Sequence, residues 1–136
     1  MEQEKIKHLE FIENIINRMN TNSFQIKGWM ITIVSALLAL YASGGKYLYI
    51  FSATIPTSLF WFLDSYYLLQ ERKFRELYSD VIASENNVVP FSMNVSKYDK
   101  GRCRYISCLL WSKTTTPLYL IIIALLIISG MYLVKM

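Results

Sequence analysis

The chain has 136 residues, of which 54% are hydrophobic and 15% aromatic, and its formal net charge is +4. One soluble core cannot bury so much apolar surface in so short a chain, so we expect a single small all-α membrane protein with the lipid bilayer as its first partner. No Ser/His/Asp set, HExxH, phosphate-binding loop or GxGxxG motif is present, which argues against an enzyme, and we expect no cofactor and no metal site. Cys103 and Cys108 have neither CxxC spacing nor a nearby histidine, and reduced or buried thiols are expected rather than a disulfide.

Residues 1–23 are predicted to form a cytosolic amphipathic helix. Apolar side chains such as Ile6, Leu9 and Ile12 recur there at helical spacing. Their stripe would pack against other cytosolic segments or partner subunits, or else lie on lipid headgroups. The polar residues 20–23 are expected to interrupt this helix and to cap the next one.

Residues 24–43 are predicted to form the first membrane span. Lys27 can extend its amine toward one interface, and Trp29 and Tyr41 suit the two borders of the bilayer. A ridge of small residues would permit close approach of another helix, either from the same chain or from another subunit, and comprises Ser35, Ala39 and Ser43. Residues 44–46, two glycines and a lysine, are expected to close a tight hairpin.

Residues 47–69 are predicted to form the second span and to continue as a cytosolic helix to about residue 83. As a helix this apolar run reaches about 34 Å, which exceeds the hydrocarbon thickness of about 30 Å. Pro56 removes one helical hydrogen bond, so we expect a kink.

The second span carries a polar stripe beside one carboxylate. By helical spacing the stripe shares one face, which is interpreted either as a packing seam or as the lining of a pore in an oligomer, and it comprises Thr54, Ser58, Trp61 and Ser65. Asp64 lies beside it. That carboxylate is expected either to bond Thr32, Ser35, a neighbouring tyrosine or Lys27, or to form an acidic ring at the inner mouth of a cation pore, or to stay protonated.

Residues 84–113 are predicted to form a small irregular cytosolic segment. Val88-Val89 or Phe91 to Val95 could form short extended pieces, and the stretch from Ile106 to Trp111 is compatible with either a strand or an interfacial helix. Residues 114–134 are the predicted third span, which would be capped by a threonine, begin at Pro117 and anchor the chain in lipid.

Basic side chains gather in the predicted cytosolic part, where they would bind anionic headgroups or an anionic ligand such as a nucleotide or oligonucleotide. The candidate ligand-binding residues are Arg72, Lys73, Arg75, Lys100, Arg102 and Arg104. With three spans, every Lys and Arg except Lys46 and Lys135 falls on the side of the N-terminus. The positive-inside rule therefore predicts a cytoplasmic N-terminus and an extracytoplasmic C-terminus.

Two segments, FQIKGWMITIVSALLAL (24–40) and FWFLDSYYLLQERKFRELY (60–78), together with the hairpin between them, resemble a family of small bacterial membrane effectors of antiphage defence systems. They are similar to the membrane effector of the Hailong nucleotidyltransferase system, and the likeness covers the general layout of residues 6–117. The resemblance implies an oligomeric, ion-channel-like protein that a nucleotide product gates from the cytosol, so that its opening depolarises the membrane. A cytosolic nucleotidyltransferase would then be the partner.

The first functional hypothesis is therefore a gated homo-oligomeric pore, with a tetramer as the best guess. The rival hypothesis is a non-conducting membrane adaptor that docks a cytosolic partner through the helix at residues 3–22. A membrane enzyme is the third class, and it lacks clustered catalytic groups.

Overall fold

The structure, a computed structural model, describes residues 2–83, 91–99, 101, 106–107, 111–113 and 115–136. Its elements are the helices α1 (Glu2–Gly44), α2 (Leu48–Ser52), α3 (Thr54–Ala83) and α5 (Thr116–Lys135) and the short 3-10 helix η1 (Ser96–Tyr98). These ranges contain no strand, which confirms the all-α fold class.

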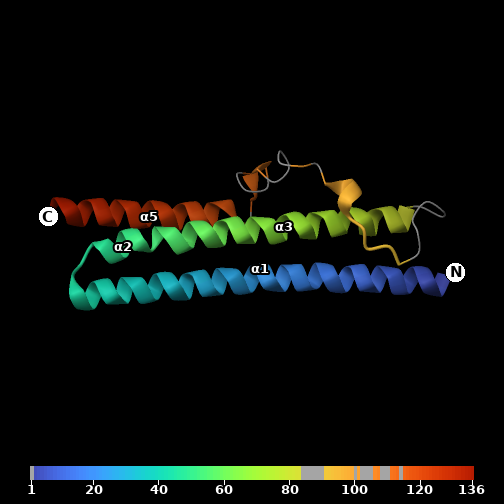
Figure 1. Cartoon of the computed structure of the whole chain (residues 1–136), viewed down its shortest axis with the longest axis horizontal. Helices are drawn as coiled ribbons and strands as arrows, with labels where there is room; N and C mark the ends of the chain where they lie inside the picture. Colours follow the sequence, from blue (N-terminus) through green and yellow to red (C-terminus); the bar gives the residue numbers. More distant parts are fainter. Residues whose placement is uncertain (1, 84–90, 100, 102–105, 108–110, 114) are drawn as a thin grey trace.

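Two long antiparallel helices, α1 and α3, form the frame of the molecule (Figure 1). The inward face of α1 carries buried side chains at intervals of three, four or seven residues, from His8 at one end to Val34 at the other. The facing stripe of α3 includes Asp64, Leu77 and Val81. Because both stripes follow the helical period, the two helices stay packed along their common length.

Helix α1 is continuous through residues 20–23, so the predicted interruption there is wrong. The two helices expected over 1–23 and 24–43 form one helix of 43 residues. Asn20 and Thr21 face solvent, whereas Ser23 is buried and continues the inward stripe toward α3. Packing of that stripe outweighs the weak helix propensity of the four polar residues.

The α1–α2 hairpin is confirmed. Gly45 adopts a left-handed φ of 67°, and its N–H donates to the Tyr41 carbonyl at 2.7 Å, which ends α1 as a C-cap glycine does. The helix predicted for 47–69 is divided at Ala53 into α2 and α3. Pro56 lies in the first turn of α3, where a missing N–H costs least, so the chain places the break just before the proline.

Helix α5 packs along α2 and the first part of α3, on the side away from α1 (Figure 1). Its Pro117 stands in the first turn as predicted, and the side chain of the N-cap residue Thr115 makes no capping hydrogen bond; Thr114 lies outside the described residues. Gly130 lies against the ring of Phe51, and a Cβ there would come within 2.8 Å of the ring. The core of this half joins α1, α2 and α5 and includes Met30, Ile50, Ala53, Tyr119 and Leu126.

The opposite end of the frame has a second core. Ile12 and Ile16 of α1 pack there against Leu77 and Val81 of α3, and Tyr98 of η1 covers them. Residues 91–95, one of the two stretches expected to be extended, form no strand, and Phe91 has a left-handed φ of 59°; the other stretch, Val88-Val89, lies outside the described residues. The stripe of the N-terminal helix thus packs against the chain's own α3, one of the two roles expected for it.

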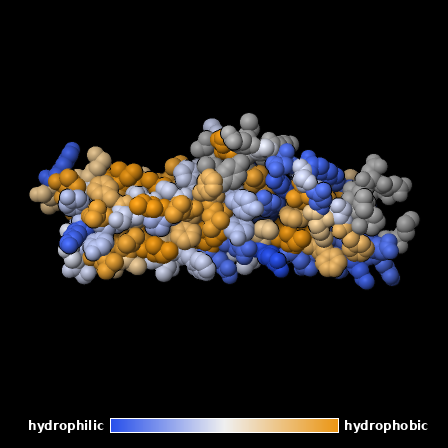
Figure 2. Space-filling model, viewed as in Figure 1, coloured by the Kyte–Doolittle hydropathy of each residue, from blue (hydrophilic) through white to orange (hydrophobic). Residues whose placement is uncertain are grey.

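Apolar and polar surfaces are sorted along the length of the molecule (Figure 2). We call the part that contains α2, α5, residues 24–44 of α1 and residues 54–69 of α3 the apolar half, and the remainder the polar half. By length and composition, α1 and α5 could each cross a membrane, and only 17% of the apolar window in each is buried, whereas a soluble core helix would be mostly covered. Neither α2 nor α3 meets the same test, so the third span stays a prediction.

Candidate functional site

The Asp64 carboxylate is the centre of the candidate site. It lies on the inward face of α3 with no exposed surface. Leu48, the first residue of α2, is sixteen positions earlier, so Asp64 is about 24 Å of helix away from the hairpin. A carboxylate buried in an apolar environment requires cationic and hydrogen-bonding partners, because desolvation strongly disfavours its charge.

Helix α1 supplies the first two partners. The Lys27 Nζ atom lies 2.6 Å from Asp64 Oδ2, and its side chain is 23% exposed. Ser23 precedes Lys27 by four residues, so both side chains project from one face of α1. The Ser23 hydroxyl donates to Asp64 Oδ1, and Lys27 Nζ donates to Ser23 Oγ at 2.8 Å. The amine therefore holds the carboxylate both directly and through the serine.

Helix α5 supplies the third partner. The fully buried Tyr119 donates its hydroxyl to Asp64 Oδ2 at 3.2 Å. Its ring stacks on Trp61 of α3, with the ring centroids 6.5 Å apart and the planes at 17°. The Asp64 network, which we define as Ser23, Lys27, Asp64 and Tyr119, thus connects three helices that are far apart in the sequence.

Two of the expected partners of Asp64 are confirmed and two are not. The ion pair with Lys27 is present, and a tyrosine does bond Asp64, although it is Tyr119, which the prediction did not specify. Thr32 instead donates to the Gly28 carbonyl of its own helix at 2.9 Å, and Ser35 lies on an exposed part of α1.

The predicted polar stripe is distributed over different environments. Ser58 is exposed, Thr54 and Trp61 are half-buried, and Ser65 is fully buried. Each of the three hydroxyls donates to a carbonyl of the preceding helical turn: Thr54 to Phe51, Ser58 to Thr54 and Ser65 to Trp61. Hydroxyls bonded in this way are compatible with lipid and do not need water. Their predicted role in lining a pore of several chains stays a prediction.

Two buried polar atoms beside the network have no hydrogen-bond partner in the described part of the chain. They are Trp61 Nε1 and Thr115 Oγ1. Trp61 stacks on Tyr119, and the Thr115 carbonyl accepts from the Tyr119 N–H at 3.3 Å, so both belong to the surroundings of the network.

The candidate anion-binding residues are only partly described. Arg72 is exposed, and Lys73 is buried with its amine 3.5 Å from an Asp99 carboxylate oxygen. Arg75 pairs with Glu71 at 2.8 Å. Lys100, Arg102 and Arg104 lie outside the described residues, so whether the six side chains meet stays a prediction.

The segment at 91–99 is tied to both long helices by contacts that sequence analysis missed. His8 Nε2 lies 3.0 Å from the Ser92 carbonyl oxygen, which joins the segment to α1. Asp80 of α3 accepts from the Tyr98 hydroxyl and from Lys97 Nζ, the latter at 3.2 Å. These two hydrogen bonds lower the pKa of the Asp80 carboxyl, while burial and the bond to Asp80 raise the pKa of the Tyr98 phenol.

Ser23 and Tyr119 are the network members that sequence analysis did not name. Ser23 was interpreted as a helix cap, although its spacing of four from Lys27 was a signal for a shared face. Tyr119 gave no local signal, because its contact with Asp64 joins residues 55 positions apart.

Within the described ranges, no three His, Cys, Asp or Glu side chains are grouped so that they could hold a metal ion, and both cysteines fall outside those ranges. Searches of protein-family models, of curated proteins and of solved structures found no match to this chain.

Proposed function

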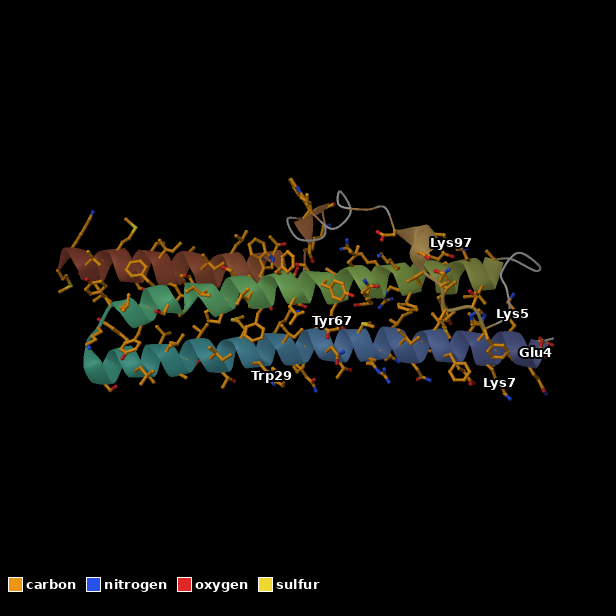
Figure 3. The ribbon with its side chains drawn as sticks, viewed as in Figure 1. Glu4, Lys5, Lys7, Trp29, Tyr67 and Lys97 are labelled. Atoms are coloured by element: carbon orange, nitrogen blue, oxygen red, sulfur yellow. The ribbon has the colours of Figure 1, made fainter. Side chains whose placement is uncertain are left out.

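We propose that the chain is a multi-pass protein of the bacterial inner membrane that crosses the bilayer through α1, α2 with the first part of α3, and α5. Its N-terminus would be cytoplasmic and its C-terminus extracytoplasmic. Support comes from the apolar half, which exposes large aliphatic side chains on α1 and α5, and from Trp29, which points away from the other helices (Figure 3). Lys27 and Asp64 would then lie near the cytoplasmic border of the bilayer.

We further propose that several copies form an ion-conducting effector whose closed state is held by the Asp64 network. The observation that carries this proposal is the full burial of Asp64 between a lysine, a serine and a tyrosine from two other helices. An ionisable group at this depth is costly, and proteins use such groups in ion pathways and switches. Opening would separate Asp64 from Lys27 and turn it toward a path shared between copies.

The two long helices provide the mechanical connection to the cytosol. Helix α1 runs without interruption from His8, which bonds the segment at 91–99, to Lys27. Helix α3 likewise connects Asp64 with Asp80. A nucleotide or oligonucleotide bound by the cytosolic cations would displace these helix ends. The displacement would shift the Asp64 network from its closed arrangement to the open one. From the resemblance to antiphage effectors we infer the biological role, in which opening of the pore depolarises the membrane of an infected cell.

Electrical recording on the full chain in planar bilayers tests the proposal. Nucleotides and short oligonucleotides added on the cytosolic side should open a current in the wild type, and Asp64→Asn should conduct without ligand because the ion pair is lost. Thr32→Ala, which removes an exposed hydroxyl bonded only to its own helix, should behave as the wild type. Absence of current under every ligand, with Asp64→Asn harmless to cells, would contradict the proposal.

A non-conducting adaptor is the second candidate, favoured by apolar side chains left uncovered on the N-terminal part of α1. Phe11 is 52% exposed and Ile6 is 51% exposed, whereas Leu9 packs against the core at that end. A partner would therefore contact Phe11 and Ile6. Co-purification with a co-expressed nucleotidyltransferase should be lost in Phe11→Asp if the adaptor hypothesis is correct, and an intact complex would exclude this docking face.

A further inference from the structure

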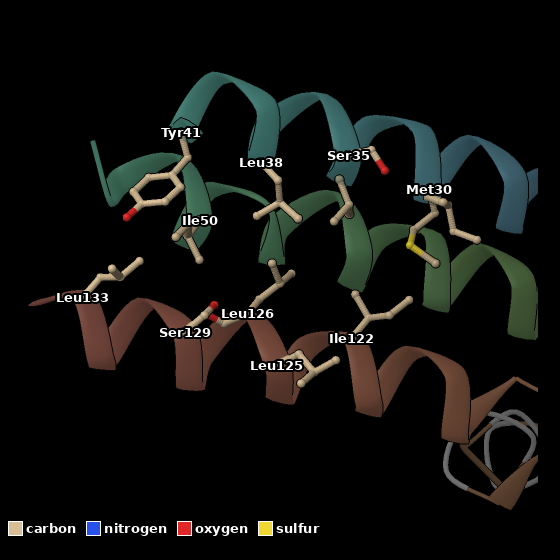
Figure 4. Close-up of a pocket in the computed structure, with 12 residues that line it drawn as sticks. Met30, Ser35, Leu38, Tyr41, Ile50, Ile122, Leu125, Leu126, Ser129 and Leu133 are labelled. Carbon is tan, nitrogen blue, oxygen red and sulfur yellow. The ribbon is translucent and has the colours of Figure 1, made fainter. Parts of the chain in front are cut away.

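An open groove runs along the apolar half between α1 and α5 (Figure 4). Its volume is about 520 Å³, within the range of about 300–1,000 Å³ that is common for ligand sites. The walls are aliphatic, with Val34 and Leu38 on α1 and Ile122 and Leu125 on α5, and Ile50 of α2 lies between them.

The groove is open because its two walls do not meet. No Cα atom of α1 lies within 8 Å of one of α5, since α2 and α3 separate them. The lining of the groove is almost entirely apolar, and the hydroxyl of Ser129 donates to the Leu126 carbonyl at 3.0 Å within its own helix. A membrane-embedded groove of this kind accepts a hydrocarbon chain and offers nothing to a charged or strongly polar ligand.

The length of the groove matches one leaflet of a bilayer. On α1 it extends from Met30 to Tyr41, and on α5 from Ile122 to Leu133. Each interval is eleven residues, or about 16 Å of helix, and half of a hydrocarbon core of about 30 Å is about 15 Å. Tyr41 and Leu133 mark the end of the groove that is nearest the hairpin (Figure 4).

That end carries cations and no acids. Lys46 lies in the α1–α2 hairpin and Lys135 is the last residue of α5, and the hairpin and the C-terminus lie at the same end of the molecule (Figure 1). Apart from Asp64, residues 14–70 contain no Asp or Glu, and residues 100–136 contain none at all. An anionic group placed beside the mouth of the groove would therefore meet the side chains of two lysines and no Asp or Glu side chain.

We propose that this groove binds one acyl chain of an anionic phospholipid from the leaflet at the hairpin end, with the phosphate of that lipid beside Lys46 and Lys135. The inference rests on the membrane placement of α1 and α5 and does not depend on conduction. Each lysine contributes about fivefold in affinity, which corresponds to about 1 kcal/mol for one cation near an anionic lipid surface.

Native mass spectrometry of the detergent-purified full chain, titrated with phosphatidylglycerol or with phosphatidylcholine of the same chain length, tests the site. We expect one retained phosphatidylglycerol per chain and weaker retention of phosphatidylcholine. Lys46→Gln and Lys135→Gln should each weaken phosphatidylglycerol about fivefold and leave phosphatidylcholine unchanged. The matched control is Lys113→Gln, an exposed lysine just before α5 at its other end, which should change neither.

Filling the groove separates this site from general contact with lipid. Ser129→Phe should abolish retention of both lipids, whereas Ala124→Phe, on an exposed part of α5 outside the groove, should not. Ser35→Phe, from the opposite wall, serves if Ser129→Phe does not fold. Equal retention of the two lipids by the wild type would overturn the proposal. The proposal would also be overturned if the groove-filling variants changed the number of associated chains and left the number of retained lipids unchanged. The groove would then hold a helix of a second copy.

Discussion

Asp64 is a carboxylate whose polar partners in the described part of the chain are all donors. Lys27 neutralises its charge, and Ser23 and Tyr119 donate to its oxygens. A buried ion pair contributes little net stability compared with apolar residues of the same volume, but the removal of one partner typically costs about 3–5 kcal/mol. The network therefore joins three helices and is vulnerable to the loss of any member.

Tyr119→Phe should destabilise the protein. It removes a hydrogen bond to an ionised acceptor, for which about 1.5–3 kcal/mol is typical, while keeping the ring that stacks on Trp61. Thermal unfolding in detergent, followed by helical circular dichroism, measures the loss. Tyr132→Phe, at a position 65% exposed, is the matched control and should unfold as the wild type does. Equal midpoints for both variants would show that the Tyr119 hydroxyl contributes nothing.

The attachment of η1 to α3 should depend on pH at both extremes. Bonds from Tyr98 and Lys97 hold the pKa of Asp80 below its ordinary 3.8, so their stabilisation is complete above that pH and is lost as the pH falls through the lowered value. The bonds to Tyr98 and Asp80 raise the pKa of Lys97 above 10.5, and burial and the bond to Asp80 raise that of Tyr98 above 10.0, so this stabilisation is lost at high pH. The attachment should therefore persist between roughly pH 4 and pH 10.

An NMR titration of the amide shifts of residues 96–98 in detergent measures the acid transition. Tyr98→Phe should move its midpoint upward toward 3.8, because the largest cause of the lowered Asp80 pKa is removed. A wild-type midpoint above 3.8 would contradict the assignment.

At the scale of single helices, most of the fold could be predicted from periodicity. The hairpin at Gly45, the continuation of the second helix to Ala83 and the helix that begins near Pro117 all follow from local signals. The predicted break at residues 20–23 was wrong, because the Ser23 side chain bonds a residue 41 positions away. Local propensity cannot report a partner that arrives through tertiary packing.

The contact between α2 and α5 depends on a residue without a side chain. Gly130→Leu should force Phe51 out of its place, because even a Cβ would lie 2.8 Å from the ring, and overpacking of this kind costs about 1–3 kcal/mol. Gly28→Leu is the control, since a Cβ there meets nothing within 4 Å. Thermal unfolding of both variants in detergent measures the difference, and Gly130→Leu should melt at the lower temperature. Equal melting temperatures would show that α2 and α5 do not pack closely.

At the scale of the whole molecule, the sequence indicated a charged, cytosolic end and an apolar end, and the hydropathy of the surface follows that division (Figure 2). The sequence predicted Lys27 as a partner of Asp64, because both residues lie near the same border of the predicted membrane spans. It could not predict which side of α3 receives α5, because that helix is apolar around its circumference and carries no orienting pattern. The position of Tyr119, and hence the closure of the network, required the structure.

The central claim is that the pair of Lys27 and Asp64 holds a conducting assembly closed. Currents through bilayers that contain Lys27→Met, Asp64→Leu or the double variant test it most directly, without any ligand. We predict that each single variant conducts, because one buried charge is left without its partner, and that the double variant is silent, because apolar side chains restore the packing of α1 on α3. If the folded single variants carry no more current than the wild type, or if the double variant conducts as they do, the pair of Lys27 and Asp64 does not hold the assembly closed.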